Sequence, residues 1–228
     1  AKYALAIGAA CACVGLLLGV LTLSGLGFKF SGAVLELAST MANAVVALDF
    51  TGFISAHGAK VFFGLLFVAI ACILMGTGIP TTPTYIILAS IAAPALATLD
   101  VPLVATHFFV FYYGVLADVT PPVALAAYAA AGIAGSEPMR TGFTAFRLSM
   151  GKALVPFMFV YAPSLLLLNF SWVEFIEAML SGMLGILALS AAYAGWFRAR
   201  IGYFALALLP VGGIALIFND WRAELFGA

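Results

Sequence analysis

Oxygen-bearing side chains and helix-breaking residues are concentrated in one short stretch of an otherwise apolar chain. Residues 76–84 read GTGIPTTPT, so two glycines, two prolines and four threonines stand together with no charged residue on either side. Glycine permits close approach and unusual backbone angles, and proline removes a donor and breaks the helical ladder. The exposed carbonyl and hydroxyl oxygens are the ligands that a small hard cation prefers. This stretch is therefore a candidate cation site.

A second interruption follows downstream, where residues 114–134 read GVLADVTPPVALAAYAAAGIA. Here Asp118, Thr120 and the two following prolines split an apolar segment that runs from Val101 to Ala134. Unwound backbone between two half-helices offers carbonyl oxygens to cations and helix N-termini to anions. A carboxylate at the centre of a span costs roughly 2.5 to 3.5 kcal/mol. Asp118 therefore binds a cation, holds the end of a partner helix or faces a water-filled vestibule, and a proton-carrying role stays open.

The elements that position these residues must be membrane helices. Of the 228 residues, 65% are hydrophobic and 8% are charged, which is too little charge to solvate a globular surface. Most uncharged runs approach the roughly 20 residues that a transmembrane helix needs. These runs are Tyr3–Phe28, Val61–Leu99, Val101–Ala117, Val119–Ser136, Ala153–Val173, Ala178–Phe197 and Ile201–Asn219. The sequence predicts an all-α, polytopic membrane protein.

The run Val61–Leu99 predicts a helical hairpin that turns back inside the membrane. Its limbs, Val61–Met75 and Thr84–Thr98, are each about 15 residues, or roughly 22 Å, against a hydrocarbon core of about 30 Å. Backbone groups left unsatisfied in lipid cost several kcal/mol each, so the tip must face protein, water or an ion. We therefore expect a re-entrant hairpin over about residues 61–98, with both limbs entering from one face.

Charge sets the orientation and excludes some partners. Nine basic and nine acidic residues cancel, so we expect no nucleic-acid partner. The richest basic cluster, Arg140, Arg147 and Lys152, predicts a cytoplasmic loop followed by an outward span over Ala153–Leu168. The stretch Phe30–Leu48 either lies along the membrane interface or crosses as a short tilted span, and Met139–Lys152 leaves the same choice open.

The three cysteines show no spacing typical of a metal or redox site. Cys11, Cys13 and Cys72 all stand in apolar runs. We expect them to be small buried side chains.

With these residues in view, the chain resembles the large membrane subunit of tripartite ATP-independent periplasmic (TRAP) transporters, especially the fused permeases that pair with TAXI-type binding proteins. The resemblance lies in MGTGIPTTPTYIILASIAAPAL (75–96), HFFVFYYGVLADVTPPVALAAYAAAGIAG (107–135) and TGFTAFRLSMGKALVPFMFVYAPSLLL (141–167). The first two segments carry the specific motifs, because a G-x-G-x-P tip is followed at a fixed distance by an A-D-x-T-P-P break.

The resemblance implies sodium-coupled uptake of an organic anion, a carboxylate, in the bacterial inner membrane. Its implied partners are a periplasmic substrate-binding protein, the remaining permease repeat and the small membrane subunit. Residues 1–170 would form the second repeat of an inverted-repeat elevator transporter, with a scaffold helix, an arm helix at Phe30–Leu48, the hairpin, a broken helix over about 102–134 and a further span. Residues 171–228 would add C-terminal helices. Since the chain starts at Ala1 rather than methionine, we expect a section of a longer polypeptide.

By position, the resemblance also assigns the site residues. The implied sodium ligands are Gly76, Thr77, Gly78 and Pro80 of the tip, and Asp118, Thr120 and Pro121 of the broken helix. The implied substrate-binding residues are Thr81, Thr82 and Pro83. Pro83 and Thr84 depart from the family pattern, in which a small residue is common, although proline suits the first turn of a helix.

Other functions explain fewer of these features. An intramembrane hydrolase is not expected, because H-E-x-x-H, G-x-S-x-G and a second deep aspartate are missing. His57 and His107 are more simply interfacial residues than ligands. The many phenylalanines suit lipid-facing or core packing better than a pigment or quinone pocket. A non-transporting structural subunit of a larger membrane complex remains the alternative, although it does not explain two matched helix breaks.

Overall fold

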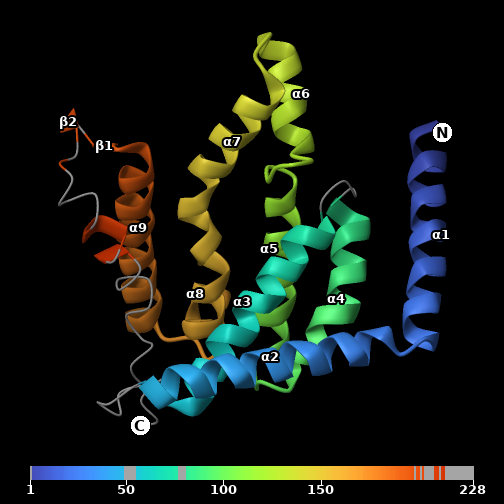
Figure 1. The fold of residues 1–228 in the computed structure, drawn as a ribbon, viewed down its shortest axis with the longest axis horizontal. Coiled ribbons are helices and arrows are strands. Elements are labelled where there is room, and N and C mark those ends of the chain that lie inside the picture. The colour runs from blue at the N-terminus through green and yellow to red at the C-terminus, as the bar shows by residue number, and fades with distance from the viewer. Residues whose placement is uncertain are drawn as a thin grey trace. The chain divides into compact units, whose positions relative to one another are not determined.

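A computed structural model describes residues 2–48, 55–76, 81–197, 199–200, 202, 208–210 and 212–213 of the chain (Figure 1). It contains two compact units, Ala1–Asp118 and Val119–Ala228, which are treated separately below. Among the described residues, the regular elements are helices apart from one pair of two-residue strands, so the predicted all-α class is confirmed.

Four helical stretches are long and apolar enough to cross a membrane by length and composition. They are Leu26–Leu48, Ala56–Gly76, Pro138–Tyr161 and Trp172–Ala194, and three shorter apolar helices accompany them in the described residues. The predicted multi-pass membrane protein is confirmed.

The first unit is built from five helices. They are α1 (Lys2–Leu23), α2 (Leu26–Leu48), α3 (Ala56–Gly76), α4 (Thr81–Ala97) and α5 (Leu103–Ala117). The helices α3, α4 and α5 pack against one another, and α3 and α4 also pack against α2. Side chains that are almost fully buried, among them Leu65, Val68 and Phe109, form the core between them.

The helix α2 lies crosswise to its neighbours in this unit. Gly25, with a φ of +65°, turns the chain between α1 and α2, and α2 then runs crosswise to α3 and α4, against which it packs (Figure 1). It begins at Leu26 rather than at Phe30, so it is longer than predicted. Its length would suffice for a span, but its crosswise course favours an arm that lies along the interface.

The first limb of the hairpin is longer than the sequence predicted. The helix α3 begins at Ala56 rather than Val61, because Ser55 caps it: the Gly58 N–H donates to the Ser55 hydroxyl oxygen at 3.0 Å. Its 21 residues correspond to about 31 Å. The extra turn carries His57 and Lys60, so the apolar part still starts at Val61. A helix of this length is compatible with a re-entrant limb and with a full transmembrane span, so the re-entrant hairpin stays a prediction.

One cysteine prediction is wrong. Cys72 is buried on α3 as expected, but Cys13 is exposed on α1. An exposed thiol on an apolar helix faces lipid or another part of a larger assembly. The Cys11 side chain lies outside the described residues.

The second unit begins with α6 and α7, and α9 is its longest described helix. Its elements are α6 (Leu125–Ala134), α7 (Pro138–Ser149), the 3-10 helix η1 (Met150–Leu154), α8 (Val155–Tyr161), the 3-10 helix η2 (Pro163–Leu166), α9 (Trp172–Ala194), β1 (Trp196–Phe197) and β2 (Ala199–Arg200). The strands pair antiparallel. In Figure 1, α7, η1 and α8 follow one another as a bent rod beside α9.

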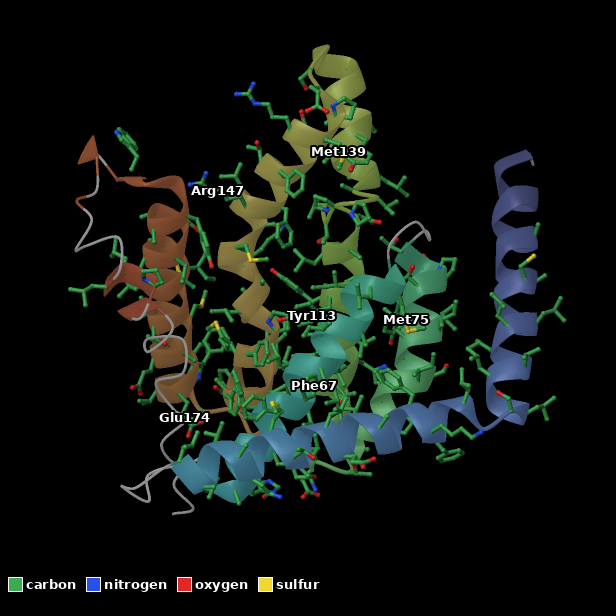
Figure 2. The ribbon with its side chains drawn as sticks, viewed as in Figure 1. Phe67, Met75, Tyr113, Met139, Arg147 and Glu174 are labelled. Carbon is green, nitrogen blue, oxygen red and sulfur yellow. The ribbon has the colours of Figure 1, made fainter. Side chains whose placement is uncertain are left out.

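The predicted span Ala153–Leu168 is wrong. Helix α8 ends at Tyr161, where Pro163 begins a 3-10 turn, and the long apolar stretch is instead Pro138–Tyr161. The basic cluster therefore lies on this rod and not in a loop, and Arg147 is exposed on α7 (Figure 2).

Lys152, the last residue of the basic cluster, lies beside the second half of α9, and the orientation of this unit in a membrane stays a prediction. A side chain added at Gly151 would meet the Ser190 hydroxyl oxygen, only four residues before α9 ends. Lys152 thus lies near the end of α9 that leads into β2 and Arg200.

Candidate functional site

The end of α3, the start of α4 and the end of α5 converge at Gly76. This glycine is the last residue of α3 and is buried. A methyl group built on it would lie 2.8 Å from the Ala117 Cβ and 3.3 Å from the Thr84 Cγ2. Carbon atoms that are not bonded prefer 3.5 to 4.0 Å, so the space admits no side chain at this position. Figure 2 shows the same end of α3, marked by Met75, beside the start of α4.

Gly114 provides a second close contact one turn earlier on α5. A methyl group there would lie 3.4 Å from the Thr84 Cγ2 and 3.6 Å from the Leu88 Cδ1. The Thr84 side chain, only 1% exposed, is thus packed between the two glycines. Gly114 and Ala117 are three positions apart on one face of α5, which lets α3 and α4 approach it closely.

Asp118 follows directly on this junction. It is the C-terminal capping residue of α5, and its N–H donates to the Val115 carbonyl oxygen at 3.2 Å. Its side chain is half-buried. Since Ala117 contacts Gly76, the structure brings the first predicted ligand of the hairpin next to the turn that carries the predicted carboxylate.

The break between α5 and α6 is an ordered turn and not a kink in one helix. Helix α5 ends at Ala117 and α6 starts at Leu125, which confirms the interruption predicted within residues 102–134. Ala124 has left-handed backbone angles, and its N–H donates to the Thr120 carbonyl oxygen at 3.1 Å. The Tyr128 hydroxyl donates to the Pro122 carbonyl oxygen at 2.6 Å.

Helix α7 supports this turn from within the second unit. A methyl group at Gly142 would lie 2.8 Å from the Tyr128 Cε1 and 3.7 Å from the Pro121 Cγ. Thr120 is buried here and Pro121 is half-buried. Both predicted ligands are therefore fixed by close packing in the unit that follows Asp118.

The remaining predicted site residues lie at the tip and in the first turn of α4. Thr77, Gly78 and Pro80 fall outside the described residues. Thr81 is half-buried, Thr82 is exposed and Pro83 is buried. Of the predicted substrate residues, Thr82 thus offers the most accessible side chain.

Sequence reasoning included Thr84 in the candidate cation stretch but missed two residues that form the junction with it, Gly114 and Ala117. Their spacing of three positions on α5 is the signal that could have indicated them. The sequence also did not indicate that His107, interpreted as an interfacial residue, would lie with its Nδ1 2.9 Å from the Tyr85 hydroxyl oxygen, within hydrogen-bonding distance. No pattern in the sequence indicated that pair.

The electrostatics of the junction favour a cation. Helix C-termini carry a partial negative charge, and α3 and α5 both end here, next to the Asp118 carboxylate. The N-terminus of α4 carries the opposite partial charge and suits an anion. In the described part of the chain, no cluster of three His, Cys, Asp or Glu side chains exists, so a cation at this place would need backbone and hydroxyl oxygens beside the Asp118 carboxylate.

The family comparison covers this whole region. The model of the tripartite ATP-independent periplasmic transporter, DctM component, matches residues 1–173, which include the hairpin, the break and α7 to α8. No curated protein and no solved structure matches the chain.

Proposed function

This chain belongs to the DctM component family of the tripartite ATP-independent periplasmic transporters, and from that membership we propose that it carries out sodium-coupled uptake of an organic anion. The family is one of transporters, so the chain would work as part of a permease and not as an enzyme. Its place would be the bacterial inner membrane.

The proposed sodium site joins the hairpin tip to the broken helix. Its ligands would be Gly76, Thr77, Gly78 and Pro80 with Asp118, Thr120 and Pro121. Backbone carbonyls at the end of α3 and around the break would supply most oxygens, since few side chains there carry one. The sodium ion would offset the negative ends of α3 and α5 and the carboxylate beside them.

The substrate would bind at the same junction, on the side formed by the N-terminus of α4. Thr81, Thr82 and Pro83 stand in the first turn of α4, where the helix N-terminus favours a carboxylate. A periplasmic binding protein would deliver this anion, and the remaining permease repeat and the small membrane subunit would complete the carrier. The hairpin would be re-entrant and would move with the broken helix as an elevator.

One observation carries the proposal: Gly76 at the end of α3 touches Ala117 at the end of α5. Two carbonyl-bearing helix ends are thereby held together beside Asp118. A structural subunit would need neither the converging C-termini nor the ordered break, because continuous helices would satisfy their backbone groups in lipid.

The test is uptake by the complete permease in proteoliposomes under an imposed sodium gradient. Asp118→Asn should abolish sodium-driven uptake while membrane insertion is kept. Asp100→Asn is the matched control: it changes the same side chain at an exposed turn, where a φ of 60° suits asparagine. Equal sodium dependence of the two variants would remove Asp118 from the site, and uptake without any sodium dependence would overturn the coupling.

A further inference from the structure

The part of α4 next to the tip is separated from the rest of that helix by a proline. Pro94 stands inside α4 and has no N–H to offer the Ser90 carbonyl oxygen. Proline inside a helix is a common place for a bend. We call residues 81–93 the upper segment of α4. It carries the proposed substrate residues between Pro94 and the start of α4.

One side chain fastens the upper segment to α5. The Tyr85 hydroxyl lies 2.9 Å from the His107 Nδ1. The Tyr85 ring also makes an edge contact with Phe111, at a centroid distance of 5.8 Å, and lies 6.1 Å from the His107 ring. Tyr85 and His107 are both half-buried, so the bond lies where water competes weakly and an unpaired hydroxyl is unfavourable.

The position of Tyr85 makes this bond sensitive to rotation of the helix. Residues four positions apart share a helix face, so Tyr85 and Thr81 lie on the same face of α4. The side chain of Thr82 points about 100° away from that face around the helix axis. Accordingly, Thr81 is half-buried and Thr82 is exposed. A rotation of the upper segment by one residue would exchange these two side chains.

Apolar contacts of α4 restrain its rotation about the helix axis less sharply than a hydrogen bond does. Ile87 and Ile91 form a cluster with Leu18, Leu21 and Phe30. Such contacts depend on buried area and tolerate small rotations, whereas a hydrogen bond weakens steeply when its geometry is lost. The close packing of Thr84 between Gly76 and Gly114 also holds this segment against α3 and α5. The bond to His107 adds a directional restraint to that packing.

We infer that Tyr85 and His107 are positioning residues that fix the rotation of the upper segment, so that Thr82 is presented and Thr81 is turned toward the protein. Their importance for transport rests on the proposed function of the tip. Neither residue needs to touch the substrate. Their effect on rotation is independent of transport and is measured separately.

The experiment labels single cysteines in the complete permease with a membrane-impermeant maleimide. Cysteines are placed by Thr81→Cys or Thr82→Cys after the native cysteines are changed to alanine. With Tyr85 intact, position 82 should react faster than position 81. Tyr85→Phe keeps both rings and removes only the hydroxyl, and it should lower the 82-to-81 rate ratio roughly 2- to 10-fold, as expected for one net hydrogen bond. Tyr193→Phe on α9 is the control and should leave the ratio unchanged.

The partner variants complete a double-mutant cycle. His107→Leu should match Tyr85→Phe, and the double variant should add nothing further, because both remove the same bond. His107→Asn places an amide oxygen near the former Nδ1 and should restore part of the ratio. An unchanged ratio in Tyr85→Phe, or additive effects of the two single changes, would overturn the inference.

Transport assays separate this inference from the proposed function. If uptake is sodium-coupled, Tyr85→Phe should raise the substrate KM more than it lowers the maximal rate, since it misplaces a binding residue and leaves the ion site intact. A changed labelling ratio in a protein without sodium-driven uptake would retain the positioning role and remove its link to substrate. An unchanged ratio in an active carrier would overturn the positioning role alone.

Discussion

A methyl group added at Gly76 should weaken the proposed sodium site by pushing α3 away from α5. The new Cβ would lie 2.8 Å from the Ala117 Cβ, which is about 0.7 to 1.2 Å shorter than a comfortable carbon contact. Neither atom belongs to a flexible chain end, so the helix ends must separate. Overpacking of this kind costs about 1 to 3 kcal/mol.

The expected effect is a weaker sodium dependence of uptake. If the cost of separation falls on the ion-bound state, the half-saturating sodium concentration should rise roughly 5- to 150-fold in Gly76→Ala. The assay is initial uptake in proteoliposomes over a range of sodium concentrations. Gly32→Ala on α2 is the matched control, because no atom lies within 4 Å of its added methyl group and alanine favours the helix.

A compensating change tests the cause directly. Ala117→Gly removes the atom that the new methyl group approaches most closely, and leaves the Thr84 Cγ2 at 3.3 Å and the Gly114 carbonyl oxygen at 3.4 Å. The double variant Gly76→Ala with Ala117→Gly should therefore recover most of the sodium affinity. The reasoning is refuted if Gly76→Ala behaves like Gly32→Ala, or if the loss persists unchanged in the double variant.

Three further predictions concern the tip and α7. Thr77→Val should abolish sodium-driven uptake but not membrane insertion, because it removes a hydroxyl of the proposed site; normal sodium dependence would exclude that role. Cysteines at positions 80 to 82 should react with aqueous thiol reagents and be protected by sodium, whereas inaccessibility under all conditions would favour a structural role. Glu137→Ala should lower stability by about 0.5 to 2 kcal/mol, seen as a lower unfolding temperature, because the Glu137 carboxylate accepts from the Met139 and Arg140 N–H groups. Glu174→Ala, exposed in the first turn of α9, is its control, and an equal loss there would contradict the capping role.

The sequence was sufficient to predict most helices and the break that separates α5 from α6. Apolar runs have the length of membrane helices, and Pro121 with Pro122 cannot continue a helical ladder. The start of α3 was missed because the capping hydroxyl of Ser55 lies in a polar stretch that resembled a loop. The span after α6 was misplaced because Arg147 and Lys152 were taken as loop markers, although long basic side chains also extend from exposed helix faces.

Only part of the candidate site could be predicted from the sequence. The glycines and prolines around Gly76 and Asp118 indicated that helices end near these two residues, since the effect of glycine and proline on the backbone is local. The packing of Gly76 on Ala117, and the bond from Tyr85 to His107, depend on how α3, α4 and α5 meet. Such long-range contacts leave no periodic signal along a chain in which most positions are apolar.

The most direct test of the central claim is equilibrium binding of radioactive sodium to the purified complete permease, compared with its Asp118→Asn variant. The account predicts saturable binding that falls by one site in the variant and is kept in Asp100→Asn. Equal binding in all three proteins would contradict a sodium ion held at the junction of α3 and α5.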